Sequence, residues 1–224
     1  MDYNKVIYSI RERIKQLTDD TSIDNREILF HVNTQRALFY RNQYNQRNRI
    51  VDEEIKQLLN VTMTQAPDEI CGSGVNCHVI KSTKKIPPTI ELHHKNALFK
   101  ATSNELTQYP FSIVTWNQFP YVSLNKYSKN EIFVALAPDG YLYAKSANKL
   151  IKFVTTILLT AILEDPTDIK DFTLCPDNSS GCFDLDTFDY PIKSYAFAYI
   201  MEQVIKIFLG KLQTPEDEEN DSES

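Results

Sequence analysis

The spacing of apolar residues changes twice along this chain, and those changes limit the folds open to it. Up to about residue 60 the apolar residues recur every three or four positions, which predicts amphipathic helices. From Val61 onward, short runs with period two and many β-branched residues predict strands. Helical spacing returns after Pro191. This order of helices, strands and helix predicts an α+β fold.

We expect four regions in that fold. Residues 1–60 would form an N-terminal helical bundle of about three helices, and residues 61–163 a central antiparallel β region. Residues 164–212 would hold a loop and a long C-terminal helix that packs back and completes the bundle. Residues 213–224 would form an acidic tail that is disordered when free.

The second predicted helix, which starts at Asn25, has the clearest start signal. Asp24 can cap the first-turn amides, and Glu27 can complete a capping box. A helix at 3–17 precedes it, and a shorter one at 52–59 follows. The polar side of the helix that starts at Asn25, with the residues just after it, carries four arginines, Arg36, Arg41, Arg47 and Arg49. They are either solvated charges, which the residues alone favour, or guanidinium groups that bind carboxylates of a neighbouring subunit.

Turn chemistry marks the remaining elements. Residues 131–145 predict a hairpin, because two apolar runs flank Pro138-Asp139-Gly140. Residues 150–163 read as a long buried strand, although their length also allows a helix. Asp165 and Pro166 predict a capped helical turn that ends near Phe172. The last helix, 191–209, is apolar around most of its circumference, so we expect it to be buried in a domain or shared between subunits.

The net charge of −6 lies almost entirely in the tail. Six acidic residues follow Pro215 with no basic residue among them, which leaves the first 215 residues close to neutral. We expect this tail either to stay solvated or to order against a basic surface of a partner. No apolar run is long enough to predict a membrane span or a signal peptide, so we expect the protein to be made in a cytoplasm.

Residues that could carry chemistry are few. The four cysteines, Cys71, Cys77, Cys175 and Cys182, have spacings that fit zinc poorly. His93 and His94 are adjacent in a predicted strand and would point to opposite faces. With only five glycines and no nucleophile or phosphate-loop motif, we expect no catalytic residue, cofactor or metal. A cytoplasmic regulator that binds metal through those cysteines, or binds nucleic acid, stays open as the alternative, although the pI near 5.3 argues against a dedicated nucleic-acid binder.

Five blocks of the sequence resemble the tail-ring, or head-to-tail connector, proteins of short-tailed crAss-like phages. The blocks lie at residues 25–49, 81–94, 121–145, 163–168 and 189–206, ahead of the acidic tail. Among them are LEDPTD and DYPIKSYAFAYIMEQVIK. The resemblance covers nearly the whole chain, and the order of the blocks is part of it.

That resemblance implies a structural virion protein with no enzymatic activity. It implies a ring of identical subunits, commonly twelve, that acts as an adaptor to the portal or to adjacent tail ring proteins. Double-stranded genomic DNA would pass through the lumen during ejection, without sequence specificity. The protein would be located in the virion tail after assembly in the host cytoplasm, with no membrane contact. A ring needs head-to-tail contacts, which we expect at Arg36, Arg41, Arg47, Arg49, Tyr199 and Phe208.

Overall fold

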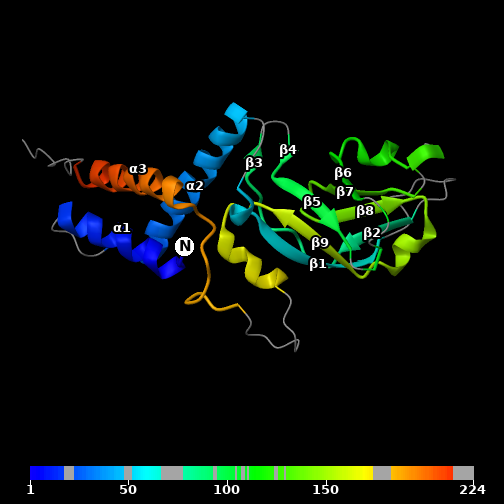
Figure 1. The fold of residues 1–224 in the computed structure, drawn as a ribbon, viewed down its shortest axis with the longest axis horizontal. Helices are drawn as coiled ribbons and strands as arrows, with labels where there is room; N and C mark the ends of the chain where they lie inside the picture. Colours follow the sequence, from blue (N-terminus) through cyan, green and yellow to red (C-terminus); the bar gives the residue numbers. More distant parts are fainter. Residues whose placement is uncertain are drawn as a thin grey trace, which may run out of the picture. The chain divides into compact units, whose positions relative to one another are not determined.

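The chain forms two compact units in the computed structural model. The model describes residues 1–17, 23–47, 52–66, 78–92, 95–103, 105–106, 109, 111–123, 126–128, 130–173 and 183–213. Met1–Ile50 and Asp184–Ser224 belong to one unit, called the helical unit here, and Val51–Phe183 form the other, the β unit. The helical unit is therefore built from both ends of the chain and the β unit from its middle (Figure 1).

Three α-helices that contact one another form most of the described part of the helical unit. They are α1 (Tyr3–Leu17), α2 (Asn25–Arg47) and α3 (Ser194–Gln213). Each buries a stripe of apolar side chains at helical spacing. The buried apolar residues are Val6, Ile7, Ile10 and Ile14 on α1, Ile28, Val32, Tyr40 and Tyr44 on α2, and Ala196, Ile200, Val204, Ile205 and Phe208 on α3. The predicted helix at 3–17 and the predicted start at Asn25 are confirmed.

Hydrogen bonds tie the two ends of the chain together inside the helical unit. The amide of Tyr190 donates to the carbonyl of Met1 at 2.7 Å, and the amide of Tyr3 donates to the carbonyl of Phe188 at 3.1 Å. The Tyr190 hydroxyl donates to Oδ1 of Asn33 at 2.5 Å. These bonds fix the segment before α3 against α1 and α2.

Seven of the nine described strands of the β unit form one sheet. The strands are β1 (Gln57–Gln65), β2 (His78–Ser82), β3 (Glu91–Leu92), β4 (Lys95–Asn96), β5 (Leu98–Thr102), β6 (Phe111–Ile113), β7 (Ile132–Leu136), β8 (Leu142–Ser146) and β9 (Thr156–Ala161). The sheet has the order β5-β9-β1-β2-β8-β7-β6, while β3 and β4 form a separate hairpin. All pairs are antiparallel except β6 with β7. A sheet dominated by antiparallel pairing was predicted.

The large sheet curves until its two edge strands meet. β5 and β6 are the first and last strands in the sheet order, yet they contact each other. The inner face holds the main core, which includes Leu59, Ile80, Val134, Leu142 and Leu159. A second cluster lies on the outer face of β2, β7 and β8, where Val79, Ala135 and Tyr143 pack against Phe119. The result is a strongly curved sheet that is filled inside and partly covered outside.

The predicted third helix at 52–59 is wrong. Only Glu53–Ile55 form a short 3-10 turn, and β1 begins at Gln57. Leu58 is 52 % exposed while Leu59 is fully buried, which is the alternation of a strand. Pairing with β9 along Gln57–Thr62 explains this outcome, because it supplies tertiary hydrogen bonds that local helix propensity does not outweigh.

Two predicted turns are confirmed. The hairpin is confirmed as β7 and β8, with Gly140 at a φ of +82° in the turn. The capped turn is confirmed as a 3-10 helix at Pro166–Phe172, where Asp165 accepts a hydrogen bond from the amide of Thr167. Residues 150–163 are only partly a strand, because Lys149–Phe153 form a 3-10 turn, labelled η5, before β9. The acidic residues after Pro215 lie outside the described residues.

Candidate interaction surfaces

Aromatic side chains of α2 and α3 meet on the surface of the helical unit. The ring of Phe39 lies 5.5 Å from that of Tyr199 and 6.2 Å from that of Tyr195, centroid to centroid. Nε2 of Gln43 donates to the Tyr195 hydroxyl at 3.3 Å. Tyr195 and Tyr199 are about half exposed, at 52 % and 51 %. We call these four residues the aromatic seam. Exposed tyrosines that offer both an apolar ring and a hydroxyl are typical of protein interfaces.

A second stripe on α2 also faces solvent. Phe30, Thr34, Leu38 and Arg41 are all exposed, and their spacing places them on one side of the helix. Phe30 is 65 % exposed and Leu38 is 43 % exposed. We call this set the outer stripe. Two large apolar side chains beside an arginine fit the composition of an interface better than that of an ordinary solvated face.

The structure places the predicted interface residues in different environments. Arg41 and Tyr199 are exposed, on the outer stripe and the aromatic seam. Arg36 is fully buried, with its guanidinium carbon 5.7 Å from the centre of the Tyr190 ring. Phe208 is 3 % exposed and meets His31 edge to face at 5.2 Å. Both therefore belong to the interior of the helical unit. Arg47 is the last residue of α2, and Arg49 lies outside the described residues.

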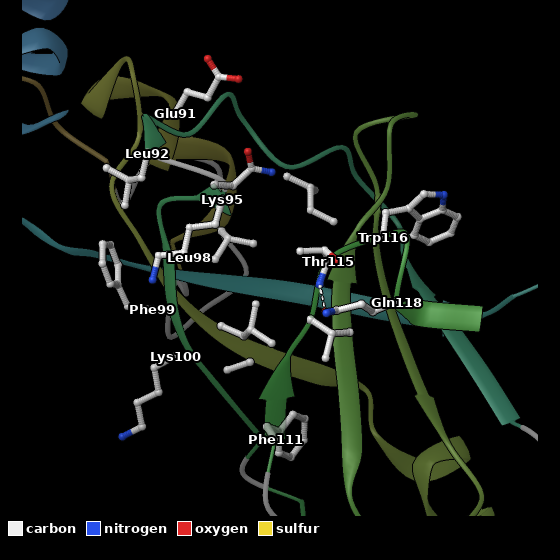
Figure 2. A pocket seen from close by; sticks show the side chains of 15 residues that line it. Glu91, Leu92, Lys95, Leu98, Phe99, Lys100, Phe111, Thr115, Trp116 and Gln118 are labelled. Atoms are coloured by element: carbon white, nitrogen blue, oxygen red, sulfur yellow. Dashed lines mark hydrogen bonds between the residues drawn. The ribbon is translucent and has the colours of Figure 1, made fainter. Parts of the chain in front are cut away.

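A groove of about 700 Å³ lies between the edge strands β5 and β6 of the β unit (Figure 2). Apolar side chains line much of it, namely Leu98, Phe99, Ala101, Phe111, Ile113, Val114 and Leu136. Glu91, Lys95 and Lys100 line the β3–β5 side, and Trp116 and Gln118 lie across from them. Both bordering strands are edges of the sheet, and they contact each other without pairing as neighbouring strands.

Aromatic stacking positions the far wall of this groove. The Trp116 ring stacks on Phe119 with centroids 5.3 Å apart and 14° between planes, and it also contacts Tyr143 at 5.2 Å. The amide of Thr115 donates to Oε1 of Gln118 at 3.4 Å (Figure 2). Beneath this segment Nζ of Lys145, a residue only 4 % exposed, donates to the carbonyl of Pro120 at 2.9 Å. The wall is thus fixed to the outer face of the sheet.

The groove suits binding better than catalysis. Its described lining residues include one carboxylate and two ammonium groups, and neither histidine nor cysteine is among them. Covalent catalysis requires a nucleophile paired with a base, and the described lining residues contain no such pair. Apolar walls with a few charged groups instead match the lining of a site that accepts a side chain or a short peptide segment.

The short turn η5 presents positive charge. Lys149, Lys152 and Phe153 are exposed, and Phe153 is 69 % exposed. Burial lowers the pKa of the neighbouring His78, and the charges of Lys152 and Lys149 lower it further. His78 is therefore neutral at pH 7, and both lysines lie close enough to influence its titration. We call Lys149–Phe153 the cationic turn. This turn was not predicted, because residues 150–163 were expected to form a long buried strand or a helix.

Within the described ranges no three His, Cys, Asp or Glu side chains gather as metal ligands would. All four cysteines and the pair His93-His94 lie outside those ranges, so the metal-binding alternative is untested there. Among the described helices, none is both long and apolar enough to cross a bilayer.

Comparison with known proteins relates the whole chain to a family. The sequence model described as phage tail ring protein 2 matches residues 5–224 of the chain. A curated relative, Ring protein 2 of Bacteroides phage crAss001, is 24 % identical over 225 residues. That alignment covers 99 % of this chain and 96 % of the relative. The match therefore includes both the helical unit and the β unit.

Proposed function

The chain belongs to the phage tail ring protein 2 family and is a structural protein of the phage virion, and we propose that identical copies of it close into a ring. The relative's name, Ring protein 2, and the near-complete alignment support this proposal. A ring requires one face of each subunit to contact a different face of the next. The aromatic seam and the outer stripe supply two distinct exposed surfaces on one unit.

The exposed tyrosines of the seam are the observation that carries the proposal. Tyr195 and Tyr199 already contact Phe39, so they present a preformed aromatic surface and lose little freedom when a partner covers it. Arg41 on the outer stripe offers a planar guanidinium to a neighbour's carboxylate. We propose the same role, binding a neighbour's carboxylate, for Arg47 and Arg49. Arg36 and Phe208 contribute from the interior: Arg36 holds α2 against Tyr190, and Phe208 holds α3 against His31 of α2.

We further propose that the ring has twelve copies, stacks on the portal or on adjacent tail ring proteins as an adaptor, and conducts DNA during ejection. The charge distribution supports a passive conduit, because residues outside the acidic tail sum to about zero. A wall without net positive charge holds phosphates weakly, so duplex DNA slides and is not retained. No catalytic step belongs to this role.

The ring contact can be tested with the double variant Tyr195→Ser and Tyr199→Ser. Removing two half-exposed rings should weaken self-association at least about tenfold, since aromatic anchors often contribute 1–2 kcal/mol each. Association would be measured by native mass spectrometry and sedimentation velocity over a range of protein concentrations. Thermal stability should change little, because neither ring is in the core.

Tyr8→Ser provides the matched control. Tyr8 is the same residue type, is 64 % exposed and lies on α1, outside the seam and the outer stripe. This variant should associate like the natural protein. If the control and the double variant associate equally well, the seam is not the ring contact.

A further inference from the structure

The cationic turn is a rigid cationic projection whose lysines have no partner within the part of the chain that the structure describes. Oδ1 of Asn148 accepts a hydrogen bond from the amide of Leu150 at 3.0 Å and caps the turn. Ile151 is 1 % exposed and anchors the turn in the core of the β unit. With the apolar side fixed inward, Lys149, Lys152 and Phe153 project outward.

Several other lysines pair with carboxylates near them in the fold. Nζ of Lys56 lies 2.6 Å from Glu53, and that of Lys206 lies 2.7 Å from Glu202. Lys81 lies 3.6 Å from Asp139. By contrast, no described carboxylate lies within ion-pair distance of the two lysines of the cationic turn, and no acidic residue occurs between Gly140 and Leu163. The turn is thus a local excess of positive charge on a chain whose first 215 residues sum to about zero.

The longest acidic run of the same chain is its C-terminal segment. Six of the eight residues from Glu216 to Glu223 are acidic, and they hold a charge equal to the net charge of the whole chain. Opposite charges on two different parts of one polypeptide are what a head-to-tail ring contact can use, because each copy gives one part and receives the other. Lysine ammonium groups also pair with carboxylates in many arrangements, since a point charge on a long side chain imposes no fixed geometry.

We propose that the cationic turn binds the acidic segment Glu216–Glu223 of a neighbouring copy. This inference rests on the proposed ring, since the ring supplies the neighbour. Duplex DNA is the less suitable ligand for the same lysines. Two ammonium groups neutralise only about two phosphates, which is too few for appreciable affinity at physiological salt. The acidic segment instead brings six carboxylates at high local concentration once the subunits are assembled.

Zero-length cross-linking of a mixed assembly tests the contact directly. Unlabelled and ¹⁵N-labelled full-length protein would be mixed, assembled and treated with a carbodiimide, which joins a lysine amine to a carboxylate with loss of water. The expected products link Lys149 or Lys152 to a residue of Glu216–Glu223, with one peptide light and the other heavy. Links only between peptides of the same isotope would show that each tail binds its own chain and would overturn the proposal, as would the absence of any such link.

Peptide binding supplies a test that does not need a ring. The probe is a fluorescent peptide of residues 214–224, and the receptor is a full-length chain in which the six tail acids are changed to amides (E216Q, D217N, E218Q, E219Q, D221N and E223Q). Adding Lys149→Glu and Lys152→Glu to this receptor should weaken binding at least about tenfold, since two ion pairs become repulsive. The matched receptor with Lys149→Arg and Lys152→Arg should keep its affinity and the same loss of binding with added salt.

The outcomes separate this inference from the ring itself. If the natural protein forms no oligomer yet the peptide binds in a lysine-dependent way, the ring proposal fails and the surface assignment stands. If the oligomer forms and the glutamate receptor binds the peptide as well as the arginine receptor does, the ring stands and this inference is wrong. A 20-base-pair DNA duplex that binds in place of the peptide, and is lost with the glutamate pair, would also overturn it.

Discussion

Lys145 shows how a single charged residue can hold part of the β unit in place. Its side chain is 4 % exposed and its ammonium group donates to the carbonyl of Pro120, which fixes the wall of the groove. Burial lowers the pKa of Lys145 below its ordinary value. The unfolded chain therefore binds this proton more tightly than the folded chain does, and the folded state bears the cost of keeping the charge.

A dependence of stability on pH follows from that cost. As pH rises from 7 towards the unfolded pKa of about 10.4, the folded chain loses this proton before the unfolded chain does. The free energy of unfolding of the natural protein therefore rises relative to that of a variant that cannot titrate at this position. The gain is at most about 1.4 kcal/mol for each unit by which the pKa is lowered. Urea denaturation of the natural protein and of Lys145→Met between pH 7 and 9.5 measures it. A difference between the two that stays constant or falls with pH would contradict this account.

Arg36 shows where prediction from single residues failed. Its charge placed it among the surface arginines, but its position follows Ile28 and Val32 and precedes Tyr40 at steps of four, which is the buried stripe of α2. Spacing was therefore the better guide than residue type. The ring of Tyr190, which receives the guanidinium, is distant in sequence, and no local pattern could have identified it.

At the scale of elements, the β7–β8 hairpin was predictable because its turn is coded locally. Gly140 adopts a φ of +82°, a conformation that side-chain-bearing residues avoid. A Cβ built there would lie 3.7 Å from Cδ of Lys85, which is an ordinary contact, so the cost of substitution is in the backbone. Gly140→Ala should lower the free energy of unfolding by about 1–2 kcal/mol.

Gly210 is the matched control for that substitution. It lies in α3, and a Cβ there would have no neighbour within 4 Å. Gly210→Ala should raise the free energy of unfolding by about 0.5–1 kcal/mol, because alanine loses less conformational freedom in a helix. Chemical denaturation of both variants gives the two signs. The same sign for both would show that the positive φ of Gly140 does not control the turn.

Other elements could not be predicted, because long-range pairing decides them. The predicted helix at 52–59 became the start of β1, since β9 lies alongside it and more than 90 residues away in sequence. The groove arises where β5 meets β6, and that meeting depends on the order of all seven strands. Most of the cationic turn falls within residues 150–163, which were expected to form a long strand or a helix, and no local signal marks where β9 begins.

At the scale of the whole molecule, resemblance told more than physical patterns did. Composition and periodicity gave the α+β class and excluded familiar catalytic motifs, but they did not point to a phage tail. Five sequence blocks in order did so, and the family match over residues 5–224 confirms it. In the proposed ring the function lies in surfaces that other copies cover, and such surfaces carry no short catalytic motif that a sequence pattern could identify.

Counting copies of this chain in purified virions tests the central claim most directly. Digested particles would be quantified by mass spectrometry against isotope-labelled peptides of this protein, with the major capsid protein as the internal standard. The account predicts a fixed stoichiometry of about twelve copies per particle, as expected for one closed ring. Absence of the chain from mature particles, or a single copy in each, would contradict it.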